Sequence, residues 1–417
     1  MNVKLSALAL GITLAYGATA AMATEAVIDQ SGDNNRGYIT QTNNHESTEA
    51  SVYASGNSNT QTIYQNRVRN GSWAYAEASG NRNNATITQE GLNHGGASVV
   101  QSASRSTTII DQGESGWGRR TSEGSSQWAH VTQNSGLDHF VYVNQRGDGM
   151  RTRITQDGYD NSARVYQDGD GGGTARFLHA NIDQNGRDLD VRVEQEGHTL
   201  TANVNQEGWG NSADVEMDGR RMVANIDQDG LRNSARLEMD GRDMTANITQ
   251  DGIGNRADVE MDGRDMVATV NQDGGLNSAN VEMDGSDLVA TVSQTGWGDR
   301  ARVELDGRNL SATVDQSGAG NRANVDLSGW GADATVLQSG AFNVANVDIR
   351  SRGDVTAFVD QSGSGNLADV ELRGSNLIAS VDQSGHRNRA YVDIRGSGTS
   401  AYINQSGNRN LGAIVQR

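Results

Sequence analysis

Side chains able to do nucleophilic, acid–base or metal chemistry are missing or scattered in this sequence. It has no Cys, which excludes a thiol nucleophile, a disulfide framework and a Cys-based metal site. The run Asp168–Thr174 (DGDGGGT) is similar to a calcium loop but lacks the remaining ligand spacing. The seven histidines follow no metal-ligand spacing: His45, His94, His130, His139, His179, His198 and His386. We predict that the protein is not an enzyme and has no catalytic, cofactor-binding or metal-binding residues.

The carboxylates recur at a fixed spacing and do not converge as an isolated catalytic pair. One set is expected to stack on an outward face: Glu216, Glu238, Glu260, Glu282, Glu304, Asp326, Asp348, Glu371 and Asp393. A second set lines the adjoining turn: Asp218, Asp240, Asp262, Asp284 and Asp306. Like charges about 4.8 Å apart repel by roughly 0.9 kcal/mol even in water. Either this is a solvated face that maintains solubility, or protons or weakly associated divalent cations relieve the repulsion and promote stacking.

Amide side chains recur every 22 residues, with one residue inserted near Ser351–Arg352. The glutamines are Gln184, Gln206, Gln228, Gln250, Gln272, Gln294, Gln316, Gln338, Gln361, Gln383 and Gln405. The asparagines are Asn211, Asn233, Asn255, Asn277, Asn321, Asn343, Asn366, Asn388 and Asn410, with Asp299 as the one departure. A buried amide stacked in register can bond the identical amide above and below it. The spacing therefore predicts a structural amide ladder that locks the register.

The elements that must position these amides are short strands. Each 22-residue block, such as ANVNQEGWGNSADVEMDGRRMV from Ala202, has two 11-residue halves in which apolar and polar residues alternate. Alternation at period 2 is the strand signal, and the following G-x-x-N stretch is turn chemistry. We predict an all-β, two-sided parallel β-solenoid with coils of strand–turn–strand–turn. The first strand of the block would face a second strand at Ala213–Met217.

Composition alone would place the chain among disordered proteins, because only 35% of its residues are apolar. The 22-residue period reverses that interpretation. The 52 glycines supply the turns, and the absence of Pro leaves no break in the strand hydrogen bonds. A net charge of −18 disfavours nucleic acid or an anionic membrane as a partner.

The chain divides into three parts. Residues 1–23 have the layout of a secretory signal peptide, with Lys4, the apolar run Leu5–Tyr16 and an A-x-A pattern that predicts cleavage after Ala23. Residues 24–179 carry the repeat with longer or imperfect turns, and residues 180–417 carry it regularly. The apolar run is too short to span a membrane, and no transmembrane segment is expected elsewhere.

At the Q-x-G-x-x-N-x-A-x-V repeat the chain resembles curlins, the subunits of curli, which are bacterial extracellular functional amyloids. The stretches that carry this resemblance are DQSGAGNRANV (Asp315–Val325), DQSGSGNLADV (Asp360–Val370) and NQSGNRNLGAIVQ (Asn404–Gln416). The resemblance implies export through the periplasm and an outer-membrane pore, nucleated self-polymerisation into cell-surface fibres (a fimbrium), and roles in biofilm and adhesion. It also implies that Gln206, Asn211 and their equivalents are the stacking amides.

Two functions stay open at this level. The first is a secreted fibre subunit that stacks end to end with copies of itself, with a curli-type nucleator and secretion pore as further partners. The second is a monomeric β-solenoid adhesin or binding protein that presents the acidic face or the turn aromatics Trp209, Trp297 and Trp330.

Overall fold

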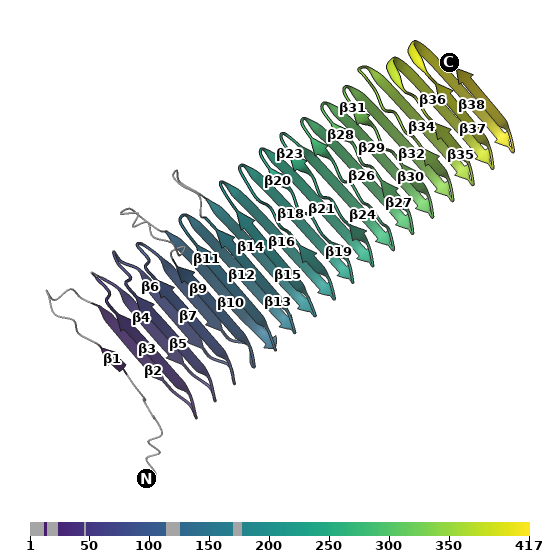
Figure 1. Cartoon of the computed structure of the whole chain (residues 1–417). Helices are drawn as coiled ribbons and strands as arrows, with labels where there is room; N and C mark the ends of the chain where they lie inside the picture. The colour runs from purple at the N-terminus through teal and green to yellow at the C-terminus, as the bar shows by residue number, and fades with distance from the viewer. Residues whose placement is uncertain (1–11, 15–23, 46, 114–125, 170–176) are drawn as a thin grey trace. The chain divides into compact units, whose positions relative to one another are not determined.

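The computed structural model describes residues 12–14, 24–45, 47–113, 126–169 and 177–417. They form two compact units: unit 1 comprises Met1–Gly210 and Met217–Arg220, and unit 2 comprises Asn211–Glu216 and Arg221–Arg417. These ranges contain no helix. In each unit parallel strands stack in successive coils (Figure 1), about 17 coils in all, which confirms the predicted all-β solenoid. The predicted cleavage site after Ala23 and most of the loop at Asp168–Thr174 lie outside the described residues.

Unit 1 has two sheets, here called sheet A and sheet B, to which the chain contributes strands alternately. Sheet A holds β1 (Ile12–Leu14), β3 (Arg36–Thr42), β5 (Thr60–Asn66), β7 (Asn84–Glu90), β9 (Thr107–Gly113), β11 (Phe140–Arg146), β13 (Ser162–Asp168) and β15 (Asp190–Glu196). Sheet B holds β2 (Glu25–Gln30), β4 (Glu49–Ala54), β6 (Trp73–Ala78), β8 (Gly96–Gln101), β10 (Gln127–Leu137), β12 (Met150–Tyr159), β14 (Leu178–Arg187) and β16 (Leu200–Trp209). Each coil is thus one strand from each sheet.

The strands of unit 1 pair in parallel, and equivalent residues of successive coils lie side by side. In sheet A, Ile39 pairs with Ile63 and Gln41 with Gln65. Inward residues are buried and their neighbours are not: in β5, Gln61, Ile63 and Gln65 are buried and the residues between them are at least partly exposed. Strand β1, inside the predicted signal peptide, pairs its Leu14 with Gln41 at the edge of sheet A.

Unit 2 has the same arrangement with a third, short sheet, here called sheet C. Sheet B of this unit holds β18 (Met222–Leu231), β21 (Met244–Ile253), β24 (Val267–Gly275), β26 (Leu288–Trp297), β29 (Leu310–Ala319), β32 (Ala332–Ala341), β34 (Val355–Ser364), β36 (Gly374–His386) and β38 (Gly396–Asn408). Sheet A holds β17 (Ser212–Asp214), β19 (Ser234–Ala235), β22 (Arg256–Ala257), β27 (Arg300–Arg302), β30 (Arg322–Asn324), β33 (Val344–Asn346), β35 (Leu367–Val370), β37 (Arg389–Ile394) and β39 (Leu411–Gln416). Sheet C holds β20 (Asp240–Gly241), β23 (Asp262–Gly263), β25 (Asp284–Gly285), β28 (Asp306–Gly307) and β31 (Ser328–Gly329).

In most coils of unit 2 the second strand is shorter than the sequence predicts. In place of a strand over Ala213–Met217, β17 ends at Asp214. In a later coil, Glu260, Met261 and Asp262 all have positive φ (79°, 138° and 110°), the half of φ space that side chains disfavour. Alternating burial nevertheless continues, since Met261 is fully buried. The alternation in the sequence therefore predicts which side chains are buried, but not the backbone conformation. An irregular backbone can bury alternate side chains just as a strand does.

We expect the turn glycines to differ sharply in their tolerance of a methyl group. Gly252 has φ +112°, and a Cβ there would lie 1.9 Å from the carbonyl oxygen of Gly274 in the next coil. Gly252→Ala should lower the free energy of unfolding by about 1–3 kcal/mol or more, since backbone strain alone has that cost. Backbone amides near the turn should also exchange hydrogen faster. Gly329→Ala, where nothing lies within 4 Å, is the control. Equal denaturation midpoints for the two variants would contradict the in-register packing of the turns.

Candidate functional site

The glutamines of sheet B in unit 2 form a continuous hydrogen-bonded column. In each coil the amide Nε2 donates to the Oε1 of the glutamine in the next coil, at 2.7–2.8 Å. The members are Gln228, Gln250, Gln272, Gln294, Gln316, Gln338, Gln361, Gln383 and Gln405, all buried. In unit 1, Gln184 donates to Gln206 in the same way at 3.0 Å.

Each glutamine also ties its strand in sheet B to sheet A of the preceding coil. The second Nε2 hydrogen of Gln250 goes to the carbonyl oxygen of Ser234 at 3.1 Å, and that of Gln272 goes to Arg256 at 2.9 Å. Both N–H donors and the oxygen acceptor of the amide are therefore hydrogen-bonded inside the solenoid. A slip of one residue would turn the amide outward and leave its partners buried without bonds, which costs about 1–3 kcal/mol for each group.

The asparagines also stack, but they bond to backbone and not to one another's side chains. The Nδ2 of Asn255 donates to the carbonyl oxygens of Asp251 at 2.8 Å and Gly274 at 3.3 Å. Its Oδ1 accepts the backbone N–H of Asn277 at 3.1 Å. This differs from the amide-to-amide bonding expected for Asn, because the shorter side chain lies in the turn, where carbonyls and N–H groups are in reach. Comparable backbone contacts occur at Asn211, Asn233, Asn277, Asn321, Asn343, Asn366, Asn388 and Asn410.

Asp299 occupies the asparagine position in one coil and leaves an atom without a partner. Its Oδ1 accepts the backbone N–H of Asn321 at 2.7 Å, as an asparagine would. Its Oδ2, where the other coils have a donating Nδ2, is buried and has no hydrogen-bond partner. Burial is the main cause that raises the pKa of the Asp299 carboxyl, while its bonds to Asn321 oppose the shift.

Unit 1 contains further amide columns that the sequence interpretation did not assign. In sheet A the bonded glutamines are Gln41, Gln65, Gln89, Gln112, Gln145, Gln167 and Gln195, at 2.7–2.9 Å. In sheet B, Gln101, Gln133 and Gln156 precede Gln184. The spacing between neighbours ranges from 22 to 33 residues, because the turns differ in length. What these glutamines share in the sequence is an Ile or Val two residues earlier, so a search for [I/V]-x-Q at strand ends, without a fixed period, would have found them.

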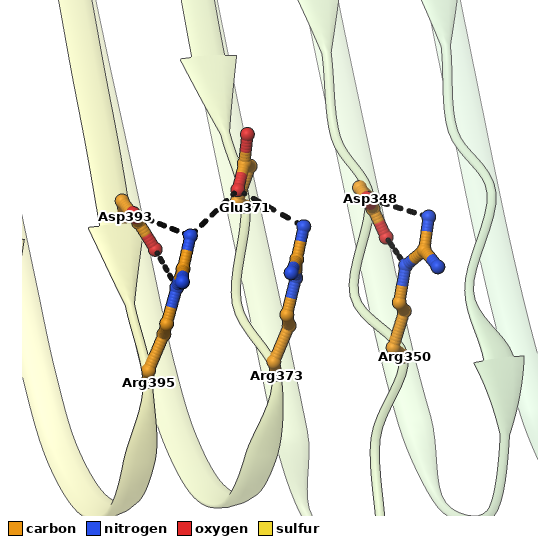
Figure 2. A network of polar contacts seen from close by, with 6 residues as sticks. All are labelled: Asp348, Arg350, Glu371, Arg373, Asp393 and Arg395. Carbon is orange, nitrogen blue, oxygen red and sulfur yellow. Dashed lines mark hydrogen bonds and ion pairs between the residues drawn. The ribbon is translucent and has the colours of Figure 1, made fainter. Parts of the chain in front are cut away.

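The acidic column follows sheet A in unit 2, and its ion pairs change along the chain. Contrary to the prediction of an outward position, Asp393 is buried. In the last coils the acid is followed two residues later by Arg, as Figure 2 shows: Asp348 with Arg350 (2.8 Å), Glu371 with Arg373 (3.3 Å) and Asp393 with Arg395 (3.1 Å). Arg395 also reaches Glu371 in the neighbouring coil at 4.0 Å. These pairs reduce the repulsion between stacked carboxylates, each by a modest amount because the arginines are exposed.

Earlier coils place Asp where these coils place Arg. Asp240, Asp262, Asp284 and Asp306 stand in register in sheet C. The pKa of Asp284 is raised, first by burial and then by the charges of its two neighbours in the column. Within the described ranges, no group of three or more His, Asp or Glu side chains is arranged to hold a metal ion. Association of divalent cations with this column remains a prediction.

Three stretches of unit 2 match a known repeat. A family model of the curlin-associated repeat matches residues 224–252, 354–385 and 374–407. No curated protein matches the chain. Among the described residues, no helix is long and apolar enough to cross a membrane.

We expect one broken link in the glutamine column to destabilise unit 2 strongly. Gln294→Leu removes the acceptor of Gln272 and the donor of Gln316, and leaves two buried amides unsatisfied. The cost should be about 1–3 kcal/mol for each, read from urea denaturation midpoints. Ser293→Ala, on the outward side of the same strand, should cost little. A Gln294→Leu midpoint equal to that of Ser293→Ala would show that the column is incidental to stability.

Asp299→Asn should stabilise the protein, and by less as the pH falls. A carboxyl whose pKa is raised by folding favours folding when protonated, so this stability is full below its ordinary pKa of 3.8 and is lost as pH rises through the raised value. Asparagine supplies the missing donor at every pH. We expect a gain of about 1–3 kcal/mol at neutral pH, measured by denaturation across the acid range. The exposed Asp315→Asn is the control, and a gain independent of pH would refute the assignment.

Proposed function

The three repeat matches assign the chain to the curlin family, and on that premise we propose that it is an exported structural subunit that polymerises into curli-type fibres. Biofilm matrix formation and surface adhesion are the roles proposed for those fibres, and a curli-type nucleator and outer-membrane pore are the proposed partners. The β-solenoid and the repeat belong to structural kinds of protein, so we assign no catalytic role. The observation that carries the proposal is a match between the first and last coils.

Both edges of the stacked coils offer unpaired strands. Within the described residues, β38 and β39 each have one partner strand, and so does β2. On the last coil Tyr402 is 65% exposed and Leu411 is 79% exposed. A strand edge with free N–H and C=O groups is a template for another chain. A second copy of this chain is the partner we propose.

The first coil (residues 26–41) and the last coil (residues 401–416) share their inward residues. The equivalent pairs are Ala26 and Ala401, Ile28 and Ile403, Gln30 and Gln405, Asn35 and Asn410, Gly37 and Gly412, Ile39 and Ile414, and Gln41 and Gln416. The glycines make room for the isoleucines opposite: a Cβ on Gly37 would lie 2.9 Å from Ile28, and one on Gly412 would lie 3.3 Å from Ile403. Two coils with the same inward shape can stack as neighbours.

Gln416 is poorly satisfied within its own chain. It stands in register with Ile394, which offers no donor, and its Oε1 is buried without a partner. At the other edge, the Oε1 of Gln41 also lacks a donor, although its Nε2 bonds to Gln65. In every column the Nε2 points to the coil that follows, so Gln416 of one copy would donate to Gln41 of the next. Removal of the predicted signal peptide would take β1 away and uncover that edge.

Elongation should depend on Gln416. The variant Gln416→Met continues the apolar column of Ile394. We expect it to slow fibre growth of residues 24–417 about tenfold or more. The reason is that Gln41 of the next copy stays buried without a donor, at about 1–3 kcal/mol for each contact between copies. Ile394→Met, inside the same column, should grow at the wild-type rate. Thioflavin kinetics and electron microscopy measure both.

The possible outcomes test the contact between copies and the fibre function separately. If the wild type forms fibres and Gln416→Met fibres grow at the same rate, the proposed bond between Gln416 of one copy and Gln41 of the next is refuted, but the fibre function is not. A wild-type chain that stays monomeric, without a cross-β reflection near 4.7 Å, would refute the fibre and favour the adhesin, whose exposed turn residues include Trp297 (55%) and Trp330 (60%). Parallel runs at mildly acidic pH and with calcium test whether protons or cations relieve the acidic column.

A further inference from the structure

Two tyrosines of adjacent coils lie against each other on the outer face of sheet B in unit 1. Tyr53 is on β4 and Tyr75 is on β6, with ring centroids 5.5 Å apart and an interplanar angle of 39°. The register pairs Tyr53 with Glu77, so the two rings are diagonal neighbours across the strands. Both rings are half-buried, which restricts their movement apart.

The phenol of Tyr75 is hydrogen-bonded to a carboxylate. The Oη–H of Tyr75 donates a hydrogen bond to Glu77, two residues along the same strand. Burial, followed by this bond and the charge of Glu77, raises the pKa of Tyr75 to about 12. At neutral pH Tyr75 therefore keeps its proton, and a proton acceptor is already in contact with it.

We propose that Tyr53 and Tyr75 are a site of oxidative modification, at which a one-electron oxidant such as a peroxide-derived radical joins the rings as dityrosine. Glu77 is the positioning residue that accepts the phenolic proton of Tyr75. The proposal concerns neighbouring coils within one copy and does not rest on fibre assembly.

The step balances with two equivalents of oxidant. Each phenol loses one electron and its phenolic proton, and the proton of Tyr75 moves to Glu77. One ortho carbon of each ring forms the new C–C bond. The hydrogen on each of those carbons then returns to its phenolic oxygen as the rings become aromatic again. In total two electrons reduce the oxidant, two protons pass to solvent, and the product is two hydrogen atoms lighter.

A second tyrosine pair in unit 1 provides an internal comparison. Tyr142 and Tyr166 have ring centroids 5.4 Å apart at 46°, nearly the same geometry. The Tyr142 oxygen, however, accepts a hydrogen bond from the amide of Asn144 at 3.1 Å. An amide N–H cannot take up the phenolic proton, so this pair should be oxidised more slowly.

A link between Tyr53 and Tyr75 would join two coils covalently. It would close a loop in the unfolded chain and restrict that chain's freedom, as a disulfide does. The cross-linked protein should therefore unfold at a higher denaturant concentration than the unmodified protein. In a chain without Cys, this would be a covalent tie made by a different chemistry.

The test oxidises the monomeric full chain with a light-activated ruthenium complex and persulfate, and maps the products by peptide mass spectrometry. We expect dityrosine first between Tyr53 and Tyr75. Glu77→Gln should lower that yield several-fold and leave the Tyr142–Tyr166 yield unchanged, and Tyr53→Phe should abolish it. Circular dichroism verifies that each variant is folded.

Three results would overturn the proposal. The first is a Glu77→Gln yield equal to that of the wild type, and the second is faster linkage of Tyr142 to Tyr166. The third is modification governed by exposure alone, with Tyr159 (51% exposed) and Tyr402 (65% exposed) reacting before the pair.

Discussion

The buried glutamine amide that bonds the same amide in the next coil is the interaction on which the rest of the structure depends. A solenoid with two facing strands per coil has a thin interior, filled by residues such as Ala246, Ile248 and Gln250. The apolar area available to such a core is small, so hydrogen bonds must hold the coils in register. Because each amide is satisfied only by its copies and by the facing backbone, one register is strongly favoured over all others.

That requirement leaves some positions constrained and others free. Turn glycines such as Gly252 touch the backbone of the next coil, so no side chain fits there. Residues between the strands are much freer, and unit 1 accommodates spacings from 22 to 33 residues while its glutamines still meet. The outer faces are free to carry charge, aromatic pairs or ion pairs, because those side chains are not part of the column.

Much of the fold could be predicted because repetition makes a weak local signal strong. Alternation along Ala202–Gln206 indicates a strand, and its recurrence every 22 residues indicates stacked parallel strands. The backbone of the second side could not be predicted, since Glu260, Met261 and Asp262 alternate in burial like a strand while their φ angles are positive. The bonding of the asparagines was also out of reach, because it depends on where turn carbonyls lie in the neighbouring coil.

By itself, the sequence determined the solenoid class, the inward orientation of each repeated glutamine and the absence of thiol chemistry. These properties follow from the period, the alternation and the composition. Only the tertiary structure decided which atoms go without partners. The unpaired oxygens of Asp299, Gln41 and Gln416, and the contact between Tyr53 and Tyr75, arise between coils 22 or more residues apart. A hydrogen bond or ring contact requires a distance of a few ångströms, and only folding brings residues so far apart in sequence to that distance.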